Sequence, residues 1–163
     1  MQYHEDLLLL SKRILEQDGA KPSQASLRRS VSTVYYALFH SLAQAGADLL
    51  VGETNDSLGT HAWRRVYRGL EHGLARTACG RWEIMREFPL PIQDFGKFFV
   101  AMQKARNVAD YDPYKILTKF SVEAYINRAE EVMKGFDEAP EKDRRAFCIH
   151  VLFKPRKEES RKF

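Results

Sequence analysis

Hydrophobic side chains recur three or four positions apart along most of this chain, the spacing of helices with one buried face. The best-defined stretch follows Ser23, which can cap a long helix that ends near Gly52. Its apolar positions are Leu27, Val31, Val34, Leu38, Leu42, Ala45 and Leu49. No alternating, strand-like run appears before Ala146. The pattern therefore predicts an all-α fold.

Two helices are predicted on either side of this long helix. The first spans residues 3–17 and places Leu7, Leu10 and Ile14 on one stripe. The other begins at a cap at Thr60, after a turn-rich loop, and reaches about Ala78. Its apolar face consists of Trp63, Tyr67, Leu70 and Leu74.

The second half of the chain predicts two more helices and one ambiguous segment. After a short helical turn between Cys79 and Pro91, a helix runs to about Tyr111, because Asp112 precedes a proline. Its inward positions are Ile92, Phe95, Phe99 and Met102. The stripe of a further helix, from about 121 to 136, is Val122, Ile126, Ala129, Met133 and Phe136. Residues 146–153 alternate like a strand, although 143–152 also fit a last helix.

The composition favours one domain over residues 1–153, followed by a basic tail over residues 154–163. The tail holds five basic and two acidic residues, so it contributes most of the net charge of +4. Overall charge therefore does not by itself indicate nucleic acid. The two cysteines lack metal-ligand spacing, and no apolar run is long enough to span a membrane. We expect a cytoplasmic protein without a metal or other cofactor.

Polar residues form two stripes with helical spacing. On the long helix, Arg29, Thr33, Tyr36 and His40 face away from the main apolar stripe, either as a solvated or packed face or as a binding cleft. On the next helix, a cationic stripe consists of His61, Arg65, Arg68, His72 and Arg76. Residues 60–86 hold six arginines and two acids, which fits either a solvated face or contact with phosphate groups.

A third group of polar residues lies where the helix before Pro113 ends. Continuing its inward stripe by four residues reaches Arg106, so an arginine occupies a core-facing position. A buried arginine needs partners, and Asp110 is one turn away. The pair could simply fix the helix end, or it could form the floor of a polar cleft together with Tyr111 and Tyr114.

Three parts of the chain together resemble the HEPN domain, a nucleotide-binding family of higher eukaryotes and prokaryotes. These parts are the segment from Tyr35 to His40, the single residue His61, and the segment from Arg106 to Tyr111. The order and spacing match over about residues 5–135. The resemblance implies an antiparallel four- to five-helix bundle with an irregular C-terminal segment, which commonly forms a homodimer. It also implies toxin–antitoxin or defence biology linked to RNA, with a nucleotidyltransferase-type antitoxin as a partner.

Ribonucleases of that family use an arginine and a histidine that are separated by four to six residues. Arg106 matches the arginine, but Tyr111, Asp112 and Pro113 occupy the histidine positions. Three hypotheses follow: a module that binds RNA or a nucleotidyltransferase, a metal-independent ribonuclease, and a non-catalytic adaptor. The candidate cleft consists of Arg106, Asp110 and Tyr111, with Tyr36 and His40 nearby. In the ribonuclease, His40 or Tyr111 would replace the lost base, and His40 is the better candidate.

Overall fold

The computed structural model describes residues 2–155 and contains only helices and connecting loops in that range. The helices are α1 (Tyr3–Gln17), α2 (Gln24–Leu50), α3 (Ser57–Gly69), α4 (His72–Cys79), α5 (Trp82–Met85), α6 (Leu90–Tyr111), α7 (Lys119–Glu138) and α8 (Glu141–Leu152). The all-α prediction is confirmed. Most of the predicted basic tail, residues 156–163, lies outside the described residues. None of the described helices is both long enough and apolar enough to cross a membrane.

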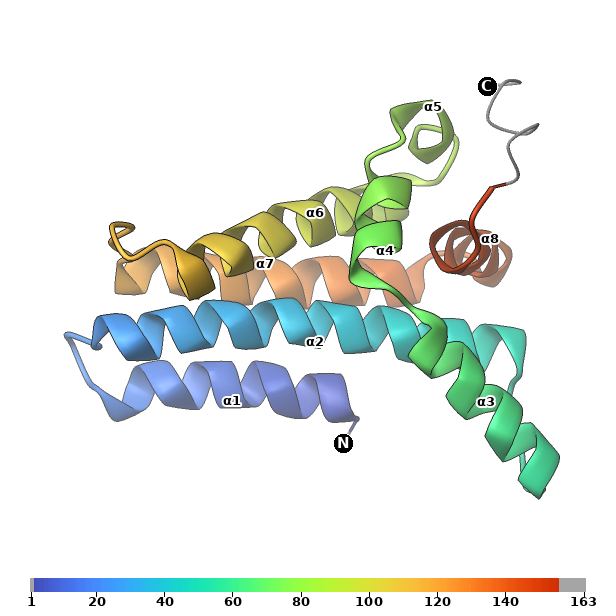
Figure 1. Ribbon diagram of the computed structural model, residues 1–163, viewed down its shortest axis with the longest axis horizontal. Coiled ribbons are helices and arrows are strands. Elements are labelled where there is room, and N and C mark those ends of the chain that lie inside the picture. Colours follow the sequence, from blue (N-terminus) through green and yellow to red (C-terminus); the bar gives the residue numbers. More distant parts are fainter. Residues whose placement is uncertain (1, 156–163) are drawn as a thin grey trace.

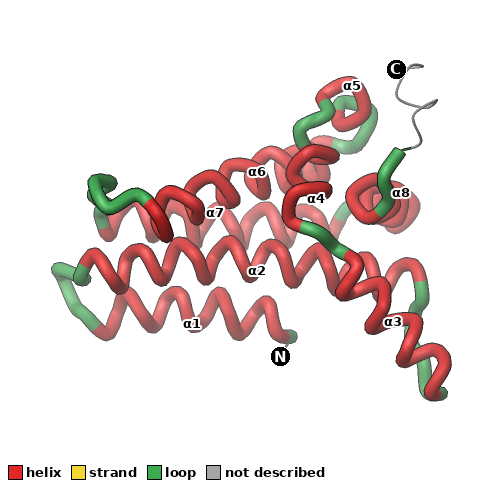
Figure 2. Tube along the Cα trace, viewed as in Figure 1, coloured by secondary structure: helices red, strands yellow, loops and turns green. Residues whose placement is uncertain are grey.

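Four long helices form the body of the molecule. Figure 1 shows that α1 and α2 run antiparallel, and that α6 and α7 form a second antiparallel pair stacked on them. Helix α8 crosses one end of this bundle, while α3 projects away from it (Figures 1 and 2). The observed arrangement is therefore the predicted antiparallel bundle, with short helices between its two pairs.

Helix α2 is the centre of the bundle and packs most extensively against α1, α3, α6, α7 and α8. Ser23 caps it as predicted, accepting a hydrogen bond from the backbone N–H of Ser26 at 3.1 Å. The predicted positions from Leu27 to Leu42 are buried, whereas Ala45 and Leu49 are half-buried. Small buried residues on its other faces let several helices approach closely: Ser30, Ser32, Ala37, Ser41, Ala43, Gly46 and Ala47.

Aromatic side chains form the part of the core between α6, α7 and α8. Phe95 and Phe99 of α6, Phe136 of α7 and Phe147 of α8 are fully buried, and the Phe95 and Phe136 ring centroids lie 4.9 Å apart. The stripes predicted for α6 and α7 are all buried, as expected. The ambiguous segment 146–153 is helical up to Leu152, because α8 presents Phe147, Cys148 and Val151 to this core.

The stripe predicted for α1 was wrong. Its buried residues are His4, Leu8, Ser11 and Leu15, whereas Leu7 and Ile14 are half-buried and Leu10 is exposed. The buried face includes polar side chains because some find partners on α2. The hydroxyls of Ser11 and Ser30 lie 2.6 Å apart, and each also lies within hydrogen-bond distance of the other residue's carbonyl oxygen, at 3.2 and 3.0 Å.

The single helix predicted from Thr60 to about Ala78 was also wrong. Asp56, not Thr60, caps α3, and the helix ends at Gly69 because the next two residues are extended. Of the predicted apolar face, Leu70 is buried, and Trp63, Tyr67 and Leu74 are half-buried. Burying Leu70 at the break redirects the chain, so α4 packs against α6 and α8 instead of continuing α3.

Three polar side chains of α2 hold the end of α6 and the following loop. Gln24 exchanges two hydrogen bonds with the backbone of Leu117, at 2.8 and 3.0 Å. One turn later, Arg28 donates to three carbonyl oxygens at 2.6 to 2.8 Å, those of Ala109, Asp112 and Lys115. Another turn later, Ser32 donates to the Asp110 carboxylate. We call Gln24, Arg28 and Ser32 the α2 ladder; it fixes the helix end that carries Arg106.

Candidate functional site

Arg106 lies at the inner side of α6, where the buried stripe predicts it. Its side chain is 15% exposed. The guanidinium carbon lies 5.3 Å from the ring centroid of Tyr35 and 5.6 Å from that of Tyr36. Two neighbouring aromatic rings of α2 therefore hold the cation by cation–π contacts in a partly dehydrated position.

Most of the hydrogen-bonding capacity of Arg106 is unused. Its Nη1 donates to the Asn107 side-chain oxygen at 3.0 Å, and its Nε lies 3.7 Å from an Asp110 carboxylate oxygen, too far for a hydrogen bond. Nε is buried and has no hydrogen-bond partner among the described residues. Since a guanidinium has five N–H donors, Arg106 can still donate several hydrogen bonds to an anionic group.

His72, the first residue of α4, belongs to the same site. Its Nδ1 lies 2.5 Å from the Tyr35 hydroxyl, and its ring stacks on Phe39 with centroids 4.0 Å apart. Gln103 of α6 donates to its backbone carbonyl oxygen at 3.2 Å. Burial lowers the pKa of His72, and the charge of Arg106 lowers that pKa further. The imidazole is therefore neutral at pH 7 and is held in one orientation.

We call Tyr35, Tyr36, His72, Arg106 and Asp110 the Arg106 cluster. Sequence reasoning assigned His72 only to a cationic stripe and gave Tyr35 no role of its own. The break after Gly69 turns His72 toward α2 and α6, so no spacing in the sequence indicates this contact. Burial raises the pKa of Tyr35, so its hydroxyl stays protonated and can pair with Nδ1 in either tautomer of the imidazole.

His40 lies in an adjacent group of aromatic residues. Its Nδ1 lies 2.7 Å from the Tyr67 hydroxyl of α3, and its ring meets Tyr3 of α1 edge-on with centroids 4.8 Å apart. Trp63 stacks on Tyr67. Burial lowers the pKa of His40, and the nearby histidines add to the effect. Tyr36 lies between the two groups, with its ring centroid 6.4 Å from that of His40.

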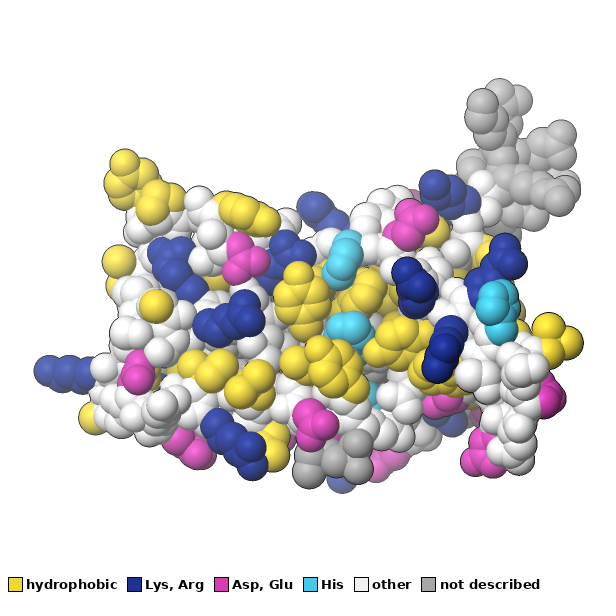
Figure 3. Space-filling view, turned by 60° about the horizontal axis from the view of Figure 1, so that its bottom comes forward, with side chains coloured by type: hydrophobic (Ala, Val, Ile, Leu, Met, Phe, Trp, Pro, Cys, Tyr) yellow, Lys and Arg dark blue, Asp and Glu magenta, His cyan; other side chains and the backbone are white. Residues whose placement is uncertain are grey.

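One aromatic face extends across α2, α3 and α4. It consists of Tyr36, His40, Trp63, Tyr67 and His72. In Figure 3, histidine side chains lie among hydrophobic ones, with lysine and arginine side chains around them. Two hollows carry cations. The α3 hollow, of about 600 Å³, is lined by His61, Arg64, Arg65, Arg68 and Gly69. The α4–α6 hollow, of about 620 Å³, is lined by Arg76, Lys104, Asn107, Val108, Tyr111 and Asp112.

The break between α3 and α4 thus divides the cationic stripe expected from the sequence. His61, Arg65 and Arg68 line one hollow and Arg76 the other, while His72 turns inward. Of the polar stripe on α2, Arg29 is exposed, and Thr33 is buried with its hydroxyl donating to the Arg29 carbonyl oxygen. Tyr111 is 77% exposed and lines the α4–α6 hollow rather than joining the Arg106 cluster.

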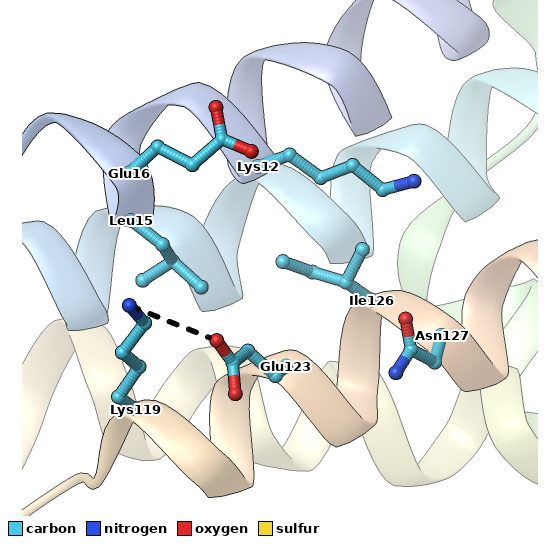
Figure 4. A pocket seen from close by; sticks show the side chains of 7 residues that line it. All are labelled: Lys12, Leu15, Glu16, Lys119, Glu123, Ile126 and Asn127. Atoms are coloured by element: carbon cyan, nitrogen blue, oxygen red, sulfur yellow. Dashed lines mark ion pairs between the residues drawn. The ribbon is translucent and has the colours of Figure 1, made fainter. Parts of the chain in front are cut away.

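A smaller hollow, of about 310 Å³, lies between α1 and α7 (Figure 4). Leu15 and Ile126 give it an apolar base, with Lys12, Glu16, Lys119 and Glu123 around them. Both lysines already have partners, because Lys12 pairs with Glu130 and Lys119 pairs with Glu123 and donates to the Gly19 carbonyl oxygen. This hollow therefore offers a ligand little uncompensated charge.

No group of three or more metal-ligating side chains converges within residues 2–155. Cys79 and Cys148 are both buried, and burial raises the pKa of each thiol to about 12, which makes both poor nucleophiles. The polar chemistry of the described chain is therefore concentrated on the aromatic face.

Comparison with family models, with curated proteins and with solved structures finds no match to the chain. The function is therefore inferred from the residues of the site and from the motifs to which they belong.

Proposed function

We propose that this protein is a HEPN-like module of a toxin–antitoxin or defence system that binds single-stranded RNA at the Arg106 cluster. The observation that carries the proposal is Arg106 itself. This arginine is mostly buried on two tyrosine rings, yet most of its N–H donors are unused. A phosphate oxygen is the acceptor that suits such a planar donor fork.

The surroundings of Arg106 favour RNA over a small anion. Proteins that bind single strands combine stacking surfaces for bases with cations that follow the backbone. Here the aromatic face supplies rings, and the two hollows supply arginine and lysine side chains beyond the cluster. The motif residues Tyr36 and Arg106 meet directly, while His61 lies in the α3 hollow.

The proposed homodimer and the nucleotidyltransferase-type partner both need an exposed apolar surface. The α6–α7 connection offers one, consisting of Tyr114, Ile116 and Phe120, each at least 70% exposed. A large aromatic side chain can bury about 150–250 Å², so covering this patch would supply a substantial part of the roughly 800 Å² per partner of a standard interface. The α2 ladder fixes the connection, which lowers the entropy cost of using it.

A second candidate function is metal-independent RNA cleavage, because His72 lies near Arg106, and burial together with the charge of Arg106 lowers the pKa of its imidazole. In the tautomer whose Nδ1–H donates to the Tyr35 hydroxyl, His72 could take the proton from a ribose 2′-hydroxyl at Nε2, and the 2′-oxygen would then attack the adjacent phosphate. The bond from phosphorus to the 5′-oxygen would break, and the leaving oxygen would take a proton from solvent. The products would be a 2′,3′-cyclic phosphate and a 5′-hydroxyl end, with Arg106 stabilising the charge on the phosphate oxygens. The charge of Arg106 acts on His72 but not on His40, which lies in the adjacent group, so His72 is the better placed base.

The test is incubation of the full chain with a fluorescent single-stranded RNA, scored for mobility shift and for cleavage. We expect Arg106→Ala to weaken binding by at least about tenfold, and Arg106→Lys to recover only part of it. Arg13→Ala, which removes an exposed arginine on α1, is the matched control. Circular dichroism confirms that each variant is folded.

The outcomes separate the functions. Cleavage that disappears in Arg106→Ala and His72→Gln, but not in His40→Gln, would establish the ribonuclease. A shift without cleavage supports the binding module. If the wild type neither shifts nor cleaves RNA, the proposal is wrong and a protein-binding adaptor becomes the better account.

A further inference from the structure

We infer that the α4–α6 hollow binds one nucleoside monophosphate unit, with its phosphate between Arg76 and Lys104 and its base on the ring of Tyr111. The inference rests on the proposed function, because it names the ligand group held next to Arg106. Asn107 connects the two places, since it lines the hollow and accepts a hydrogen bond from Arg106.

The phosphate position follows from two cations on different helices. Arg76 extends from α4 and Lys104 from α6, and both line the same hollow. Neither forms an ion pair with any acid of residues 2–155, unlike the lysines of the α1–α7 hollow. The lining also contains one acid, Asp112, which accepts the backbone N–H of Tyr114 at 2.9 Å, so the two cations outnumber it. Two unpaired cations that converge on one hollow favour a dianionic or phosphodiester group.

The base position follows from Tyr111. Its side chain is 77% exposed although it lines the hollow, so one ring face is open to a stacking partner. The backbone beneath it is rigid, because Arg28 bonds the carbonyl oxygens on either side, those of Ala109 and Asp112. Val108 adds an apolar contact to the lining.

Asn107 supplies a polar contact to the base or ribose. Its side-chain oxygen accepts from Arg106 at 3.0 Å, which leaves its amide group as a donor toward the hollow. The volume of about 620 Å³ falls within the range of about 300–1,000 Å³ that is usual for small-ligand sites. The hollow therefore offers a phosphate contact, a stacking face and a polar group at the scale of one nucleotide.

The test compares ligands and variants on the full-length chain. AMP, UMP, ribose 5-phosphate and inorganic phosphate are titrated by calorimetry, and a labelled ten-nucleotide RNA by fluorescence anisotropy over a salt series. The variants are Arg76→Ala with Lys104→Ala, Tyr111→Ala and Tyr111→Phe. The matched control is Arg13→Ala with Lys142→Ala, which removes the same charge from exposed sites on α1 and α8. All substituted residues are exposed, so the fold is retained.

We expect AMP and UMP to bind more tightly than ribose 5-phosphate, and inorganic phosphate to bind weakest. The double variant in the hollow should weaken nucleotide and RNA binding by at least about tenfold. It should also reduce the salt slope for RNA by about 0.7, the value for one phosphate on a single strand. Tyr111→Ala should weaken binding by about tenfold, and Tyr111→Phe should retain it because the ring remains.

The failures are distinguishable. If Arg106→Ala weakens RNA binding but the hollow variant behaves like its control, this inference is overturned and the proposed function stands. If nucleotides bind at the hollow while RNA does not bind at all, the nucleotide site stands without the RNA function. Equal affinity for all phosphates, unaffected by Tyr111→Ala, would exclude recognition of a base.

Discussion

His72 is the residue whose environment most clearly gives a pH-dependent property. Burial and the charge of Arg106 both lower its pKa below the ordinary 6.5, so the unfolded chain binds a proton there more readily than the folded chain. We therefore expect the free energy of unfolding to decrease as the pH falls from about 7.5 to 5.5. His72→Gln should make that decrease smaller. Urea unfolding at several pH values, followed by circular dichroism, measures both.

His61→Gln is the matched control, because it removes one imidazole from an exposed position on α3. His40 and His150, whose pKa values burial also lowers, keep part of the pH dependence in either variant. Parallel loss of stability in the wild type and both variants would show that protonation of His72 is not coupled to folding.

For single residues, the sequence predicts the direction in which a side chain faces better than it predicts the residues that the side chain contacts. The inward position of Arg106 follows from counting four residues beyond Met102 on a helix. Its contact with Asp110 is equally local, because the two are one turn apart. Arg106 also contacts Tyr35 of another helix and acts through its charge on His72 of a third. The position of His72 depends on the break after Gly69, which local spacing does not reveal.

Among the elements, the α2 ladder links one helix to the end of another, and Arg28 contributes most of it. Its three bonded carbonyls lie at or just beyond the C-terminal end of α6, where a cation also interacts favourably with the helix dipole. We expect Arg28→Ala to lower the free energy of unfolding by about 2–3 kcal/mol. Chemical denaturation measures the change.

The neighbouring Arg29 provides the control for that experiment. It is exposed and makes no side-chain hydrogen bond within residues 2–155, so Arg29→Ala should change stability by less than about 0.5 kcal/mol. Both substitutions remove one charge from the same turn of α2. Equal losses would mean that the charge of this helix, and not the bonded carbonyls, sets the effect.

Helices were predictable where one apolar stripe determines their packing. Helices α2, α6 and α7 have the expected stripes because their core positions are hydrophobic. The stripe expected for α1 was wrong, because Ser11 is buried beside a hydrogen-bonding partner on α2. A hydrophobicity pattern does not indicate such a buried polar residue. The α3–α4 break was not predicted, because Leu70 fits the apolar spacing of one continuous helix. In the structure Leu70 is the extended residue that follows the end of α3, and its side chain is buried.

Across the whole molecule, arginines without acidic partners in residues 2–155 line hollows on α3 and between α4 and α6, which adjoin the aromatic face. The hollow between α1 and α7 has both lysines paired, whereas both hollows beside the Arg106 cluster hold arginines without acidic partners in residues 2–155. The net charge of +4 would not have shown this, because acids elsewhere offset it. Local placement of charge therefore supports nucleic-acid contact where the overall balance does not.

The projecting helix α3 gives the prediction at this scale. None of its residues is buried, and Arg65 and Arg68 line its hollow without acidic partners, so they can follow an RNA backbone beyond the Arg106 cluster. Replacing both with alanine should reduce the slope of log affinity against log salt by about 1.4, the value for two phosphates on a single strand. Arg13→Ala with Lys142→Ala should leave the slope nearly unchanged. If the two double variants give the same slope, α3 does not contact RNA, and its cations remain available for an acidic protein surface.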